Sequence, residues 1–335
     1  MQFVHASTRF PAIGPVPDPG SDPGVVAAWW NGLSPFDRTV LLTEYPERVG
    51  SLDGVPSEVR DLANRALLGI ERERLEAVAL QLQEELENNV FGGLVSNADA
   101  GLAQTLNKLD ALDAIDRTLA LDDRRLLALD MSGREAMAAV AVGDIDTADH
   151  IAVYTPGAGS TVQGNLHGYD QQVSALRDEA RRELGRVDRG SETVAAVTWM
   201  NYQAPHFGWG LAFTERSPVS DLSATLAAPR LATFLDGLDA SRPDSPPHVT
   251  AIGHSYGALV TSLALQQGAE ADKAVFAGAA GSVPPTSAHS EWRPDRCSSS
   301  RQMKTHRRHR DLRRRPQSSS GPDPSFQRCG RRFFG

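Results

Sequence analysis

Val249-Thr250-Ala251-Ile252 is followed by Gly253-His254-Ser255-Tyr256-Gly257 and then by Ala258-Leu259-Val260-Thr261-Ser262-Leu263-Ala264-Leu265. The first run is typical of a short buried strand, and the last is typical of a helix. The middle five residues match Gly-x-Ser-x-Gly, a tight turn that exposes its serine above the end of a strand. The pattern alone is common, but its position between a strand and a helix predicts that Ser255 is a nucleophile.

Short apolar runs alternate with helical segments around this turn. Strands are predicted over residues 125–129, 136–142, 151–155, 194–199, 249–252 and 273–277, and helices over 173–184, 222–238 and 255–267. We expect the second of these helices to break or kink at Pro229. The first two strands flank Asp130-Met131-Ser132-Gly133 and should form a hairpin. The alternation predicts an α/β protein with a mainly parallel sheet between helices, and a hairpin leading into such a sheet is typical of the α/β-hydrolase fold.

The part of the chain before this core has a different pattern. Residues 1–24 are rich in proline and glycine and are expected to form a disordered leader or linker. Residues 25–121 are predicted to be helical, with two long apolar stripes that pack into the core or, alternatively, dock another protein. Aromatic residues should pack a small helical lid or collar there, with ligand stacking as the alternative: Trp29, Trp30, Phe36 and Tyr45.

A second turn, Thr155-Pro156-Gly157-Ala158-Gly159-Ser160, follows the third predicted strand. An oxyanion hole needs two backbone N–H groups, one from the residue after the nucleophile and one from an earlier loop. We therefore predict that Tyr256 and Ala158 are the two donors. A turn that merely closes the strand is the alternative interpretation.

The same loop and the fourth strand supply residues for a pocket. Gly157 and Gly159, together with Trp199 and Tyr202 near the end of the fourth strand, are expected to line the acyl pocket, although a packing role for the two aromatic residues stays open. A dinucleotide site does not fit, because the next glycine, Gly164, is at the wrong spacing. We expect no cofactor and no metal.

The acid and base of a catalytic triad cannot be named. In this fold they follow later strands, and no strand-like run occurs after residue 280. The sequence therefore predicts that the C-terminal part of the fold is missing and that the core, 122–281, is incomplete. His254 is expected to pack beside the serine rather than act as its base. Neither role is assigned to polar residues further on: His289, Asp295, His306, His309 and Asp311.

The last segment, residues 282–335, holds 13 Lys and Arg against 4 Asp and Glu, in a chain with a net charge of −8. This basic, Pro-, Ser- and Arg-rich tail is predicted to be disordered, with no specific nucleic-acid partner. An alternative is that translation has shifted out of frame near Gly281. Both cysteines, Cys297 and Cys329, lie in the tail, and no run is long and apolar enough to span a membrane, so a cytoplasmic location is expected.

Several further motifs resemble a family of actinobacterial α/β-hydrolases formerly described as a domain of unknown function. The resemblance covers about residues 25–281 and rests on Trp29-Trp30, Gly50-Ser51-Leu52-Asp53-Gly54-Val55-Pro56, Arg60-Asp61-Leu62-Ala63-Asn64-Arg65, Thr147-Ala148-Asp149-His150, Pro156-Gly157-Ala158-Gly159, Tyr202-Gln203-Ala204-Pro205 and Gly253-His254-Ser255-Tyr256-Gly257. It implies a serine hydrolase with Ser255 as nucleophile and the two oxyanion donors, and it implies no substrate, metal or cofactor.

The sequence therefore predicts a serine hydrolase, similar to an esterase or lipase, that acts on a small ester or other acyl substrate through Ser255. One alternative is a catalytically impaired scaffold with a binding role, because no triad acid or base is identifiable. A nucleic-acid-binding module led by the basic tail is the third interpretation.

Overall fold

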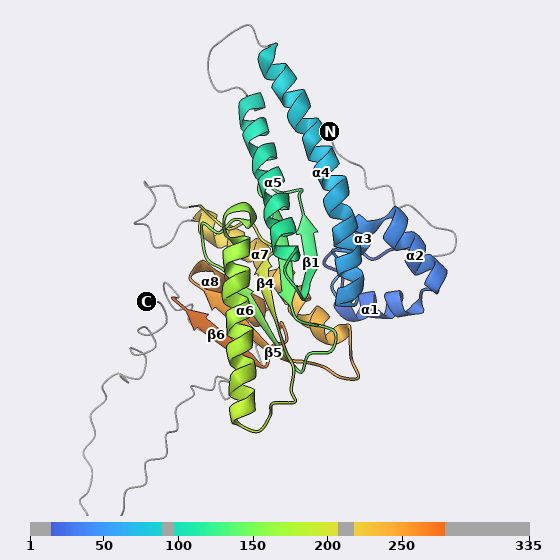
Figure 1. Ribbon diagram of the computed structural model, residues 1–335, viewed down its shortest axis with the longest axis vertical. Coiled ribbons are helices and arrows are strands. Elements are labelled where there is room, and N and C mark those ends of the chain that lie inside the picture. The colour runs from blue at the N-terminus through green and yellow to red at the C-terminus, as the bar shows by residue number, and fades with distance from the viewer. Residues whose placement is uncertain (1–14, 89–96, 207–217, 279–335) are drawn as a thin grey trace, which may run out of the picture. The chain divides into compact units, whose positions relative to one another are not determined.

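The computed structural model describes residues 15–88, 97–206 and 218–278 (Figure 1). The helices of the N-terminal part are α1 (Pro23–Gly32), α2 (Pro35–Glu44), α3 (Pro46–Val49), α4 (Ser57–Glu87) and α5 (Asn97–Leu119). The tail at 282–335, with its histidines, lies outside the described residues, as do residues 1–14 of the predicted leader. In the described ranges, no helix has both the length and the apolar character needed to cross a membrane.

Six strands form one mixed sheet in the order β1-β2-β4-β3-β5-β6. The strands are β1 (Arg124–Asp130), β2 (Met137–Val142), β3 (His150–Thr155), β4 (Val194–Met200), β5 (His248–His254) and β6 (Lys273–Ala277). The predicted hairpin is confirmed, because β1 pairs with β2 in antiparallel fashion and Asp130 lies opposite Met137. Since β2 also runs antiparallel to β4 and the other pairs are parallel, the carboxyl ends of every strand except β2 meet at one edge.

Helices bury both faces of the sheet, which confirms the predicted α/β class. One apolar cluster joins alternate strand residues such as Ala139 and Val197 to α7 (Pro218–Ala240) and α8 (Tyr256–Gln266). The other face packs residues such as Leu126 and Val140 against α4, α5 and α6 (Val162–Arg186). Because successive side chains point to opposite faces, a strand covered on both sides is apolar throughout, as all six buried residues of β2 are.

Two helices differ from the sequence prediction. Pro229 lies inside α7 without ending it, so of the break or kink expected there a break does not occur. Helix α6 begins at Val162, well before the predicted start at residue 173. The Thr161 hydroxyl caps it by accepting a hydrogen bond from the N–H of Gly164. The early glycines in this helix hide its apolar positions, because glycine is typical of turns.

The first helices enclose a small apolar core of their own. Trp30 is buried there beside Val26, Leu41 and Leu52, which supports packing as the role of this aromatic residue. Ser34 caps α2 through a hydrogen bond from the Asp37 N–H to its hydroxyl. Phe36 is 75% exposed, so the expectation that it packs in the collar is wrong.

Helix α4 covers the outer edge of β1, the first strand of the sheet. The Leu126 N–H donates to Asp61 at 2.6 Å, and the Leu126 carbonyl accepts from the Asn64 amide at 2.9 Å. Arg65, one helical turn after Asp61, donates to the Arg124 carbonyl at 2.8 Å. These three side chains pair with main-chain groups that a neighbouring strand would otherwise satisfy. We call Asp61, Asn64 and Arg65 the α4 edge clamp.

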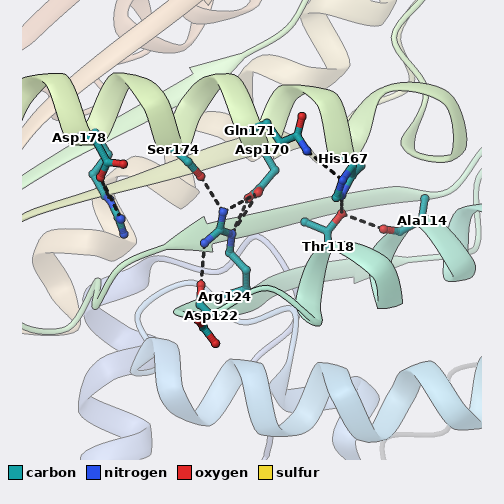
Figure 2. A network of polar contacts seen from close by, with 10 residues as sticks. Ala114, Thr118, Asp122, Arg124, His167, Asp170, Gln171, Ser174 and Asp178 are labelled. Carbon is teal, nitrogen blue, oxygen red and sulfur yellow. Dashed lines mark hydrogen bonds and ion pairs between the residues drawn. The ribbon is translucent and has the colours of Figure 1, made fainter.

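A buried ion pair joins the start of β1 to α6. Figure 2 shows the Arg124 guanidinium extended toward α6, where its Nη2 lies 2.8 Å from a carboxylate oxygen of Asp170 and 2.6 Å from the Ser174 hydroxyl. The Nε group also donates to the Asp170 carboxylate at 3.0 Å, and Nη1 donates to the Asp122 carbonyl at 2.6 Å. The two charged side chains are only 9% and 1% exposed, so neither charge is solvated by bulk water.

The first prediction concerns Asp146, which caps α4 from a loop distant in sequence. Its carboxylate accepts hydrogen bonds from the N–H groups of Ser57 at 2.7 Å and Glu58 at 3.1 Å, while the N-cap residue Pro56 makes no side-chain cap. Replacing Asp146 by alanine leaves these donors unpaired, so we expect about 1–2 kcal/mol less unfolding free energy in urea. The control Asp244→Ala removes an exposed loop carboxylate, and an equal effect of both changes would contradict the capping role.

Candidate active site

Ser255 lies in the tight turn between β5 and α8, where the sequence predicts it. Its backbone has φ 52° and ψ −120°, a conformation that residues other than glycine rarely adopt. The turn is fixed from the adjacent strand, because the Ser255 N–H donates to the Ala277 carbonyl at 2.8 Å. The direct connections to β5 and α8, together with the bond to Ala277, hold Ser255 in this strained conformation.

Three glycines make the turn and the β3 loop fit together. A Cβ on Gly257 would lie 2.1 Å from the Thr155 carbonyl oxygen, and a Cβ on Gly253 would lie 2.5 Å from the Cα of Ala258. On the opposite loop, a Cβ on Gly157 would lie 2.8 Å from the Ser255 Cβ. These distances are too short for any side chain. The two predicted loops are thus in direct contact.

The predicted oxyanion donors flank this contact. Tyr256 is the first residue of α8, so its N–H belongs to the positive end of the helix. In the β3 loop, the Gly159 N–H is already bonded to the Pro205 carbonyl at 2.9 Å. No backbone acceptor for the N–H of Ala158 occurs within the described parts of the chain, so of these two loop groups only that of Gly159 is bonded to the main chain there.

The residues expected to line a pocket lie in different surroundings. Gly157 faces Ser255, whereas Gly159 has φ 76° and open space where a side chain would be. Trp199 is fully buried in the core, which favours the packing role that the sequence left open. Tyr202 is 6% exposed, and its hydroxyl donates to the Pro156 carbonyl at 2.6 Å. Its contact is with the main chain of the β3 loop.

The loop after β4 is linked on both of its sides. Gln203 exchanges two hydrogen bonds with the main chain of Glu135, accepting from its N–H at 3.0 Å and donating to its carbonyl at 2.8 Å. The next residues reach the β3 loop through the bond from Gly159 to Pro205. Residues 202–205 therefore connect the β1–β2 turn to the loop that carries Ala158, which sequence spacing alone does not reveal.

Four of the five histidines in the described residues pair with side chains away from Ser255. His206 pairs with Glu135 at 2.9 Å, at the β2 and β4 side of the edge, with β3 between this pair and β5. His254 has a buried Nδ1 without a partner among the described residues. Across residues 15–88, 97–206 and 218–278, no histidine lies within hydrogen-bond distance of the Ser255 hydroxyl. The same ranges contain no cluster of His, Cys, Asp or Glu side chains that could hold a metal ion.

A cleft of about 570 Å³ opens at the same edge of the sheet, on the β1 side. Arg230 of α7 crosses it to Asp130 at the end of β1, at 2.9 Å, and to Asn201 after β4, at 2.7 Å. Burial raises the pKa of the Asp130 carboxyl, but hydrogen bonds from Ser132 and Arg230 outweigh this effect and hold the pKa below its usual value. Ser255 and the two predicted donors do not line this cleft.

Comparisons with known proteins agree with this architecture. The family model described as alpha/beta hydrolase matches residues 132–303, which extends past residue 281, where the resemblance was expected to end. The uncharacterized protein Rv2079 of Mycobacterium tuberculosis (strain ATCC 25618 / H37Rv) is 30% identical over 276 residues, which cover 79% of this chain and 40% of that protein. The uncharacterized protein Rv0963c of the same strain is 37% identical over 204 residues, which cover 60% of this chain and 73% of that protein.

The chain thus spans about 40% of the length of the first of these relatives and most of the second. A similar protein from Mycobacterium bovis (strain ATCC BAA-935 / AF2122/97), the uncharacterized protein Mb0988c, shows the same 37% identity over 204 residues. These mycobacterial relatives are consistent with the actinobacterial family that the sequence motifs resemble. The chain belongs to the α/β-hydrolase family.

Proposed function

We propose that this chain is a serine hydrolase that cleaves an ester or another acyl substrate through Ser255. The observation that carries the proposal is the strained backbone of Ser255 between β5 and α8, in contact with Gly157. Strain of this kind persists only where the surrounding structure enforces it, and it clusters at active sites. The turn keeps the serine at the edge where the strands end and where the loops of such sheets bind ligands.

The chemistry requires a nucleophile, an oxyanion hole and a proton acceptor. The Ser255 oxygen attacks the acyl carbon, its proton passes to a base, and the carbonyl oxygen becomes an oxyanion between the N–H groups of Tyr256 and Ala158. The alcohol leaves with a proton from the same base, and water then releases the acid from the acyl-enzyme. The base and its acid partner are not assigned to any residue.

One observation favours a second candidate function. The Ser255 hydroxyl has no histidine within hydrogen-bond distance among the described residues, and a serine without a base is a weak nucleophile. A catalytically impaired hydrolase scaffold with a binding role would have the same turn and the same contacts. The two functions differ in whether Ser255 is chemically activated.

The prediction that separates them is covalent labelling of the full-length protein by a fluorophosphonate probe. We expect one adduct per chain, located at Ser255 by mass spectrometry, and none on Ser255→Ala. The control Ser262→Ala changes a serine of α8 that lies outside the turn and should label like the wild type. A folded wild-type protein that takes up no probe would contradict the serine hydrolase and support the impaired scaffold.

A further inference from the structure

We infer that Tyr202 is a positioning residue that fixes both oxyanion donors, one through its hydroxyl and the other through its ring. The inference rests on the proposed function, because it assigns Ala158 and Tyr256 as donors. Tyr202 lies in the loop after β4, outside both the Ser255 turn and the β3 loop. Its contacts nevertheless reach both loops that meet at the serine.

The hydroxyl of Tyr202 holds the β3 loop. It donates to the Pro156 carbonyl at 2.6 Å and lies 3.4 Å from the Gly157 carbonyl, in a nearly fully buried position. Burial raises the pKa of this hydroxyl above the usual tyrosine value, so it is protonated and remains a donor near neutral pH. The peptide that it anchors directly precedes Ala158, and a movement of that peptide would move the Ala158 N–H.

The ring of Tyr202 reaches the other donor. It stacks between Trp199, at 5.9 Å and 10°, and Tyr256, at 6.5 Å and 13°. Trp199 is fully buried in β4 and also packs against Phe234 of α7, so one end of the stack is fixed in the core. Offset aromatic stacking of this kind favours a defined geometry. The stack thus restrains the side chain of the residue whose N–H is the predicted first donor.

The loop that carries Tyr202 has its own anchors. The side-chain amide of Gln203 is bonded to the Glu135 main chain through both its oxygen and its nitrogen, and the Pro205 carbonyl accepts from the Gly159 N–H. A rigid loop can hold the Tyr202 hydroxyl in place while a substrate binds. Preorganised donors act on the transition state more than on the bound substrate, because the oxyanion exists only after attack. A purely structural tyrosine would instead affect folding without a selective effect on kcat.

Tyr202→Phe tests the inference, because it keeps the ring and removes only the hydroxyl. We expect kcat for an activated ester to fall about 10- to 100-fold with KM changed less than about twofold, since a displaced donor loses part of an oxyanion interaction. Inhibition by a trifluoromethyl ketone, which forms a tetrahedral adduct, should weaken in parallel with kcat. Hydrogen exchange of the peptide that covers residues 156–160 should become faster.

Tyr154→Phe is the matched control, because Tyr154 lies near the end of β3, just before the β3 loop, and packs against Tyr169 without a described bond to that loop. Both variants are compared at a temperature where circular dichroism shows them folded. The inference is overturned if Tyr202→Phe keeps wild-type kcat and wild-type exchange, or if kcat and KM change equally in both variants. Failure of the proposed function looks different: the wild type itself would show no turnover, while the exchange measurement would still test the anchor.

Discussion

Ester turnover should fall about 10⁴- to 10⁶-fold when Ser255 is replaced by alanine, because the attacking oxygen is lost. The melting temperature should stay close to that of the wild type, since alanine fits the same backbone position as serine. What remains is the contribution of the oxyanion donors, which do not depend on the serine side chain. Hydrolysis of an activated ester by purified, folded variants measures the effect, and unchanged turnover would move the chemistry away from this turn.

Ser255→Gly extends the same experiment to stability. A residue other than glycine at φ 52° and ψ −120° costs about 1–3 kcal/mol, and glycine relieves this cost while adding freedom to the unfolded chain. We expect an inactive protein that is about 1 kcal/mol more stable than Ser255→Ala in urea unfolding. A less stable glycine variant would show that the turn is not strained.

The second large effect is expected at Asp170, the buried partner of Arg124. Replacing Asp170 by alanine leaves a guanidinium with 9% exposure and no counter-ion, which should lower the unfolding free energy by about 3–5 kcal/mol. Urea unfolding followed by circular dichroism measures the change. Activity of the fraction that remains folded should be normal, because the pair joins β1 to α6 and does not touch the Ser255 turn.

Glu179 on the same helix provides the matched control. Its ion pair with Arg182 is exposed to solvent on both sides, so Glu179→Ala should change the unfolding free energy by less than about 1 kcal/mol. A double variant, Arg124→Met with Asp170→Leu, removes both charges and should recover part of the lost stability. If Asp170→Ala and Glu179→Ala have equal effects, burial of the pair does not stabilise the fold in the way that we describe.

Much of the fold follows from simple periodicity. Each predicted strand overlaps an observed strand, because strands buried on both faces leave short apolar runs that few other elements produce. The turn at Ser255 is recognisable for a similar reason, since a glycine on each side of the serine reflects contacts that exclude a side chain. Helices were harder: α7 continues through Pro229, and glycines mask the start of α6.

The contacts around the site were less predictable. The motif at residues 202–205 is visible in the sequence, but its meaning depends on partners far away in the chain, such as Glu135 and Gly159. Trp199 lies at the end of the strand that should border a pocket and Tyr202 follows it, and only the structure shows that both are buried in the core. Polar residues on α4 resemble a solvated helix face, although Asn64 is almost completely buried against β1.

The α4 edge clamp has a practical consequence for where this chain can be shortened. A piece that begins at residue 122 would look like a self-sufficient catalytic core, yet β1 would lose the partners of its Leu126 and Arg124 main-chain groups. A piece that begins at residue 132, where the family match starts, would lose β1 altogether and leave β2 at the border. Either truncation leaves an exposed edge strand whose unpaired main-chain groups can pair with a strand of a second molecule. Expression trials should therefore retain the chain from α4 onward. By covering the edge of β1, α4 prevents that strand from pairing with a second molecule.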